Sequence, residues 1–138
     1  MADISIIVPG VPVAKGRPRL STINGHARAF TPTKTRRYED LIRLEAGRVM
    51  EGRALLENAL CVDVTAYVPI PKSLSKGRRK AAIAGSLRPI TRPDCDNYGK
   101  CVDALNQIVW RDDAQIVQLL IRKFYSDRPR LELTAVEI

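Results

Sequence analysis

Two pairs of aspartates stand at the ends of one short segment of the chain. Asp94 and Asp96 precede a helix-like apolar pattern, and Asp112 and Asp113 follow it. If the chain turns back from that helix into a strand, the second pair comes near the first. Clustered carboxylates repel one another unless a cation lies between them, and hard divalent cations prefer carboxylate oxygens. In a chain with a formal net charge of +8, the two pairs predict a divalent-metal site on a surface that binds a polyanion.

The chemistry expected of such a site is phosphodiester hydrolysis. Asp94, Asp96 and one of the later pair would bind Mg²⁺, with Mn²⁺ as the alternative. Bound ions generate a nucleophilic hydroxide and neutralise charge on the attacking and leaving oxygens. Lys100, four residues after Asp96, would lie on the same helical face and stabilise the charge that develops on the phosphate. The one histidine, His26, is expected in an exposed hairpin, so metal-bound water has to act as the base.

A structural explanation of the same residues stays open from the spacing alone. Asp96 is of a type that caps helices, and Asp94 would favour the positive end of the helix. Lys100 would then only pair with Asp96 or Asp103. The later pair of aspartates would be turn residues.

The pattern also leaves open which of the later pair would face a metal. Neighbouring residues that enter a strand point to opposite faces, so only one of Asp112 and Asp113 is expected there. Apolar residues follow on both faces of that strand. The alternation therefore does not choose between the two aspartates.

The basic residues are concentrated in two groups, which favours a nucleic-acid partner. Between residues 72 and 92 the chain carries no acid at all. The basic stretches lack large apolar residues on an opposite face, so no membrane partner is expected. The residues predicted to bind DNA are Lys15, Arg17, Arg19, Lys72, Lys76, Arg78, Arg79, Lys80, Arg88 and Arg92.

The cysteines and the first residues predict a protein of a reducing compartment. Cys61, Cys95 and Cys101 are odd in number and have no Cys-x-x-Cys spacing, so neither a zinc site nor a disulfide framework is expected. The first residues lack a basic n-region and a long apolar h-region, so no secretory signal is expected. No apolar run approaches the ~20 residues that span a bilayer. We therefore expect a cytoplasmic protein.

The order of the remaining elements predicts an α+β fold. The 138 residues favour a single domain over residues 1–138. Strands are expected over residues 4–8, 60–68, 114–125 and 131–138, with a hairpin of 20–23 and 26–30. Helices are expected over 33–50 and 75–84, and a third from Asp96 or Asn97 to Val109. This order predicts a mixed β-sheet with helices packed mainly on one face.

Five motifs follow one another along the chain. The first two are Pro9-Gly10-x-Pro12-x-x-Lys15-Gly16-Arg17-Pro18-Arg19 and Thr31-Pro32-x-x-Thr35-x-x-Tyr38-Glu39. The third is Arg92-Pro93-Asp94-x-Asp96-Asn97 with Lys100. The last two are Asp103-Ala104-Leu105-Asn106 and Trp110-x-Asp112-Asp113-Ala114-Gln115-Ile116-Val117. Together they resemble the RusA family of Holliday-junction resolvases, found in bacteria and their phages and prophages, over most of the chain.

The resemblance implies a homodimeric, Mg²⁺-dependent endonuclease that cuts four-way DNA junctions by paired nicks, in the cytoplasm of a bacterial or phage-infected cell. It maps the family's essential carboxylates onto Asp94, Asp96 and Asp113, and its catalytic lysine onto Lys100. Two other functions stay open. One is a non-catalytic nucleic-acid-binding module whose acids are structural, and the other is a generic flap or single-strand nuclease with the same metal site.

Overall fold

The structure is a computed structural model of the whole chain. It describes residues 3–15, 19–30 and 32–138, and the side chains of residues 19, 21, 23 and 28–30 lie outside that description. The strands are β1 (Asp3–Pro9), β2 (Arg19–Ile23), β3 (His26–Phe30), β4 (Leu60–Pro69), β5 (Ile116–Ser126) and β6 (Arg130–Glu137). The helices are α1 (Thr33–Met50), α2 (Lys76–Ala84) and α3 (Cys95–Gly99), with 3₁₀ turns η1 (Lys100–Leu105) and η2 (Asp113–Gln115).

A four-stranded mixed sheet in the order β1-β6-β4-β5 forms the centre of the molecule. β6 is antiparallel to both of its neighbours, whereas β4 and β5 are parallel. A parallel pair needs a long crossover connection. Here that crossover is residues 70–115, and it contains both pairs of aspartates. The sheet therefore brings the two ends of the acidic segment to one edge, at β5.

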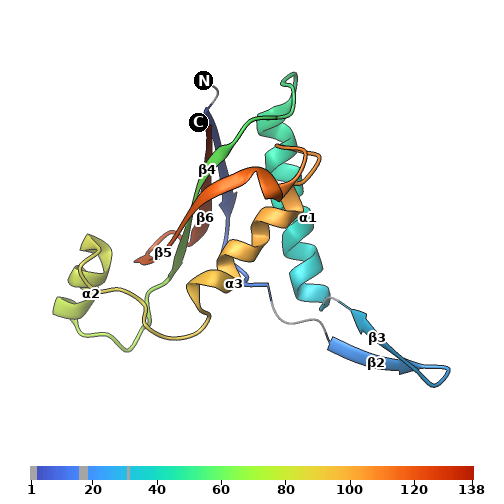
Figure 1. Cartoon of the computed structure of the whole chain (residues 1–138). Coiled ribbons are helices and arrows are strands. Elements are labelled where there is room, and N and C mark those ends of the chain that lie inside the picture. Colours follow the sequence, from blue (N-terminus) through green and yellow to red (C-terminus); the bar gives the residue numbers. More distant parts are fainter. Residues whose placement is uncertain (1–2, 16–18, 31) are drawn as a thin grey trace.

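The core lies between the sheet and the helices on one of its faces (Figure 1). Alternate residues of β1 and β4 point inward, as a strand with one buried face requires. In α1, Tyr38, Ile42, Ala46 and Met50 recur every four residues and are buried against β1 and η1. Trp110 is fully buried, and its indole Nε1 donates a hydrogen bond to Asn106 Oδ1 at 2.9 Å.

Two elements project from the body in opposite directions (Figure 1). One is the β2–β3 hairpin, whose turn at Asn24-Gly25 has φ angles of 52° and 80°, as a type I′ turn requires. The other is α2, which begins where Ser75 Oγ accepts a hydrogen bond from the Arg78 amide. It ends at Gly85, whose φ of 86° favours glycine.

The predicted α+β class, with a mixed sheet covered mainly on one face, is confirmed. The prediction of one helix running to Val109 is wrong, because α3 stops at Gly99 and continues as a 3₁₀ turn to Leu105. The strand expected from residue 114 begins at Ile116, after the turn η2. In the described residues, no helix has the length and apolar character to cross a membrane.

Candidate active site

The acidic residues are positioned by the close packing of α3 on β5. Gly99 lies against Ile121, and a Cβ built at Gly99 would overlap Ile121 Cδ1 and lie 3.1 Å from Cγ1. No larger residue fits at this position unless the Ile121 side chain moves. Gly99 thus lets the helix that carries Asp96 and Lys100 lie directly on the strand that follows Asp113.

An open depression of about 330 Å³ lies at this contact. Its polar wall is formed by three carboxylates and one ammonium group, and its apolar wall by side chains of η1 and β5. The lining residues are Asp96, Gly99, Lys100, Val102, Asp103, Asp113, Leu119 and Ile121. Residues from the two ends of the acidic segment therefore meet in one place.

Three of the four residues predicted to be catalytic line this depression, and the fourth does not. Asp96, Lys100 and Asp113 are among its lining residues, whereas Asp94 is not. Asp94 is exposed at the N-cap position of α3, yet its side chain makes no capping hydrogen bond. The structural explanation gave the cap to Asp96, and this is wrong, because Asp96 lies inside the first turn of α3.

Lys100 is held by a neighbour that the sequence did not single out for a role. Its Nζ donates a hydrogen bond to Asn97 Oδ1 at 3.2 Å, and within the described part of the chain it forms no ion pair with Asp96 or Asp103. Asn97 also accepts a hydrogen bond from the Lys15 amide through its backbone carbonyl, at 3.0 Å. Asn97 therefore orients the ammonium group and ties α3 to the first segment of the chain.

Asp103 is a third carboxylate of the depression, which the sequence placed in a motif and named only as a possible partner of Lys100. Its Oδ2 lies 2.7 Å from Lys15 Nζ, and Lys15 also lies 3.6 Å from Glu39 Oε2. The hydrogen bond to Asp103 is the main reason that the pKa of Lys15 is raised above its usual value. Lys15, predicted to bind DNA, is thus engaged inside the protein by two acids.

The later pair of aspartates lies at the start of the turn η2, where Asp112 is the N-cap residue and Asp113 is the first residue of the turn. Gln115 fixes this turn, because its Oε1 accepts hydrogen bonds from the amides of Arg111 and Asp112, at 2.9 and 3.0 Å. Its Nε2 donates to two carbonyl oxygens of residues 56 and 58. Asp112 Oδ1 lies 3.5 Å from Asn106 Nδ2, whereas Asp113 lines the depression.

The loop that leads into α3 is fastened to β5. Lys123 Nζ donates hydrogen bonds to the carbonyl oxygens of Thr91 and Pro93, each at 2.9 Å. Arg88 Nε donates to the Lys123 carbonyl at 2.9 Å, and its guanidinium lies 3.5 Å from the centroid of the Phe124 ring. No sequence signal indicated Lys123, because it acts on residues about thirty positions away.

The donor set fits a hard divalent cation of the size of Mg²⁺. Asp96 and Asp113 offer carboxylate oxygens, and neither side chain has a hydrogen bond or ion pair within the described residues. Mg²⁺ keeps several waters and is commonly held by one or two carboxylates together with substrate phosphates. Among the described residues, no group of three or more His, Cys, Asp or Glu side chains could hold a metal ion. The three predicted ligands, Asp94, Asp96 and Asp113, therefore do not form one cluster in this structure, although Asp96 and Asp113 line the same depression.

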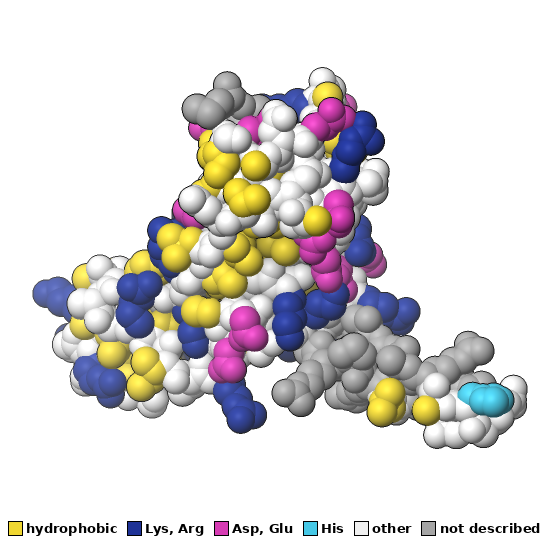
Figure 2. Space-filling view, viewed as in Figure 1, with side chains coloured by type: hydrophobic (Ala, Val, Ile, Leu, Met, Phe, Trp, Pro, Cys, Tyr) yellow, Lys and Arg dark blue, Asp and Glu magenta, His cyan; other side chains and the backbone are white. Residues whose placement is uncertain are grey.

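The predicted DNA-binding residues fall into three classes. Arg17 lies outside the described residues, and only the backbone of Arg19 is described. Lys15 is held by Asp103 and Glu39, as above. The other predicted residues are exposed on α2 and the adjoining loops, and Figure 2 shows basic side chains gathered at α2. None of them forms an ion pair with a described acid.

The cysteines offer no reactive group to the site. Cys101 is buried, and burial is the main cause that raises the pKa of its thiol to about 12. Cys61 and Cys95 are half-buried, and all three thiols are free. His26 is exposed in the hairpin turn, on an element that does not contribute to the depression.

Comparison with known proteins identifies the family of the chain. Residues 9–135 match the family described as "Endodeoxyribonuclease RusA". The chain is also 41% identical over 141 residues to YqaN of Bacillus subtilis (strain 168), which is described as an uncharacterized protein. That alignment covers 100% of this chain and 99% of YqaN.

Proposed function

Since the chain belongs to the RusA family of endodeoxyribonucleases, we propose that it is a Mg²⁺-dependent enzyme that resolves four-way DNA junctions by paired nicks. The observation that carries this proposal is the meeting of Asp96, Lys100 and Asp113 in one open depression. These residues come from separate elements of the crossover 70–115, Asp96 from α3, Lys100 from η1 and Asp113 from η2. A purely structural role would not require them to converge on one exposed surface.

Each residue of the depression would have a distinct task. Asp96 and Asp113 would hold Mg²⁺, with Mn²⁺ as the alternative, and Asp94 would contribute from the adjoining turn. When bound, Mg²⁺ supplies an activated water and neutralises charge on the phosphate that is cut. Lys100, oriented by Asn97, would stabilise the negative charge that develops on the phosphate oxygens. The apolar wall of Leu119 and Ile121 would limit access of bulk water.

The basic surface would hold the DNA backbone. Lys72, Lys76, Arg78, Arg79 and Lys80 are exposed on and before α2. Because α2 projects from the body, its cations can follow a DNA arm away from the depression (Figure 1). Phosphate contacts of this kind give affinity without sequence preference.

A homodimer would supply the second nick. A four-way junction has two equivalent strands to cut, and a two-fold symmetric dimer offers two equivalent sites. β5 is an edge strand of the sheet, and it leaves Val117, Leu119 and Leu120 45–60% exposed. Figure 2 shows apolar side chains gathered on this part of the surface. Such an exposed apolar patch is typical of an interface between protein chains.

The experiment that tests the proposal is a cleavage assay on a labelled synthetic junction and a matched linear duplex, with Mg²⁺ and with EDTA. Paired nicks in the junction, dependent on Mg²⁺, are the expected result. Asp94→Asn and Asp96→Asn should lose cleavage while keeping or tightening junction binding, because the lost charge no longer repels phosphate. Near wild-type cleavage by either variant would remove that carboxylate from the proposed metal site.

Two other outcomes would replace the proposed function. Junction binding without any metal-dependent cleavage would indicate a non-catalytic binding module. Equal cleavage of single-stranded, flap and junction DNA would indicate a generic nuclease. Both outcomes are read from the same gel.

A further inference from the structure

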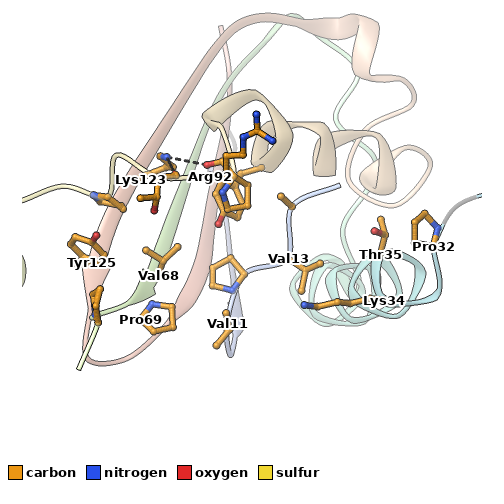
Figure 3. Close-up of a pocket in the computed structure, with 17 residues that line it drawn as sticks. Val11, Val13, Pro32, Lys34, Thr35, Val68, Pro69, Arg92, Lys123 and Tyr125 are labelled. Carbon is orange, nitrogen blue, oxygen red and sulfur yellow. Dashed lines mark hydrogen bonds between the residues drawn. The ribbon is translucent and has the colours of Figure 1, made fainter. Parts of the chain in front are cut away.

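A second cavity lies beside α3, whose Tyr98 is one of its lining residues (Figure 3). It is an open groove of about 560 Å³, within the range of ligand-binding pockets. Pro12, Pro89 and Tyr98 are buried and belong to its floor, and Val13 and Val68 are half-buried beside them. The floor is therefore apolar and formed by rigid side chains.

The charges of the groove all have one sign. The charged side chains that line it are Lys34, Arg92 and Lys123, and the described lining residues include no Asp or Glu. Lys34 and Arg92 are exposed at the rim. An apolar floor with cationic edges is complementary to a group that is flat and apolar but carries a phosphate at its end.

The groove and the depression share one wall. Tyr98 lines the groove, whereas the next residue, Gly99, lines the depression. Arg92 and Pro93 line the groove just before the chain reaches Asp96 in the depression. Because Tyr98 and Gly99 are consecutive residues of α3, the two cavities adjoin the same turn of this helix.

We propose that the groove receives one unstacked base of the DNA strand that is cut, adjacent to the phosphate in the depression. The proposal rests on the proposed function, since it names the part of the substrate next to the reacting phosphate. Tyr125, half-buried in the wall formed by β5, offers an aromatic face to the base. Every base has a π-face, so stacking there would be tolerant of sequence. Bases that are already unpaired or unstacked cost least to extrude, which would favour branch points over continuous duplex.

Two neighbouring residues of one loop provide a matched pair of variants. Thr91 lines the groove, whereas Ile90 does not and is 93% exposed. Thr91→Trp should fill the groove and keep the backbone carbonyl that Lys123 holds. Ile90→Trp adds the same bulk to the same loop outside the groove. Tyr125→Leu removes the aromatic face while keeping an apolar side chain.

The measurement is junction affinity by fluorescence anisotropy in EDTA. Junctions with a single abasic nucleotide at each position beside the branch point are compared with the intact junction. Stacking of one base contributes about 1–3 kcal/mol, which corresponds to roughly a 5- to 150-fold change in affinity. The wild type and Ile90→Trp should bind one of the abasic junctions at least about fivefold more weakly than the intact junction. Thr91→Trp and Tyr125→Leu should bind the intact junction at least about fivefold more weakly and no longer respond to the abasic nucleotide.

Two results would overturn the proposal. One is an equal response of all four proteins to every abasic junction, which would mean that no base enters the groove. The other is a Thr91→Trp variant that loses affinity for a short apolar peptide but not for DNA, which would assign the groove to a protein partner. Neither result depends on cleavage, whereas failure of the proposed function appears as absence of Mg²⁺-dependent nicks.

Discussion

Lys15 Nζ lies 2.7 Å from Asp103 Oδ2, although the two residues are 88 positions apart in the sequence. The pair connects the segment after β1 with the wall of the candidate active site. The Lys15 amide adds a second connection through the carbonyl oxygen of Asn97. These two contacts fix α3 and η1, which carry part of the site, to the segment that follows β1.

The first prediction concerns the pH dependence of this ion pair. The pKa of Lys15 is raised above its ordinary value of 10.5, chiefly by the hydrogen bond to Asp103. The pair therefore contributes fully below pH 10.5, and its contribution is lost as the pH rises through the raised pKa. Lys15→Met should reduce the free energy of unfolding by about 0.2–1 kcal/mol at pH 8, because the pair is partly exposed.

Urea unfolding at pH 8 and pH 11 checks this expectation. The difference in the free energy of unfolding between wild type and Lys15→Met should be smaller at pH 11 than at pH 8. Lys34→Met is the control, since Lys34 is exposed and forms no ion pair within the described residues. A difference that widens at pH 11 would contradict the assigned cause.

The second prediction separates the neighbours Asp112 and Asp113. Asp113 lines the depression, whereas the Asp112 side chain lies beside Asn106. Asp113→Asn should abolish cleavage of the junction. Asp112→Asn should stay within about tenfold of wild type, a loss of at most ~1.4 kcal/mol in transition-state stabilisation. Rates of the two variants on one junction decide the assignment, and equal inactivation would mean that both carboxylates serve the site.

The third prediction concerns the contact between α3 and β5. Gly99→Ala should destabilise the protein by about 1–3 kcal/mol, because the new methyl group overlaps Ile121. Cleavage should fall as well, since the shift moves Asp96 and Lys100. Gly47→Ala is the matched control in α1, where a Cβ meets nothing within 4 Å. It should stabilise the helix by about 0.5–1 kcal/mol.

A double variant tests the physical cause of the Gly99→Ala effect. Ile121→Val removes the Cδ1 atom that the new methyl group would overlap. Thermal unfolding of Gly99→Ala/Ile121→Val should show part of the lost stability restored. Purely additive losses in the double variant would show that the close approach is not the cause.

The fourth prediction concerns the salt dependence of DNA binding. If the basic surface makes 6–10 phosphate contacts, affinity should fall by roughly 10³–10⁵ between 50 and 200 mM salt. Replacing Lys76, Arg79 and Lys80 with alanine should reduce the slope of log K against log salt by roughly 2–3, about 0.9 for each lost contact. Replacing Arg43 and Arg48, which pair with acids of α1, should leave the slope unchanged. A flat salt dependence of the wild type would remove the basic surface from DNA binding.

The fifth prediction concerns the edge strand β5. Val117→Glu with Leu120→Glu should yield a monomer, because together they place a charge on each face of this exposed edge strand. Sedimentation at micromolar concentration should show a dimer for the wild type and for the control Ile90→Glu. Paired nicks should become single nicks in the monomeric variant. A wild type that sediments as a monomer yet makes paired nicks would exclude the dimer.

The sequence was sufficient for most of the fold. Alternating apolar residues predicted β4, and the helical spacing of apolar residues from Tyr38 to Val49 predicted α1, because each pattern follows directly from one buried face. The Asn24-Gly25 pair predicted the hairpin from its turn chemistry. The prediction of a helix through Val109 was wrong, because the spacing of its apolar residues does not distinguish an α-helix from the 3₁₀ turn that follows Gly99.

The site was predictable only in part. Aspartates two apart indicated Asp96, but the local pattern could not separate Asp112 from Asp113, since the turn η2 replaces the expected strand there. Asn97 lies inside a motif and could have been considered as a partner of Lys100. The role of Lys123 could not have been predicted, because its contacts with residues 91 and 93 depend on the parallel pairing of β4 and β5 rather than on nearby sequence.

Among the described strands, β5 is hydrogen-bonded to β4 alone. It carries Lys123, which holds the loop that leads into α3, and part of the apolar wall of the depression. An edge strand can separate from a sheet at a lower free energy than the global unfolding of the protein. Separation of β5 would release residues 91–115 while the pairing of β1, β6 and β4 persists. Heat should therefore inactivate the enzyme before the bulk of its secondary structure is lost. A second copy covering β5 would delay that inactivation, so the half-life of activity should shorten when the protein is diluted.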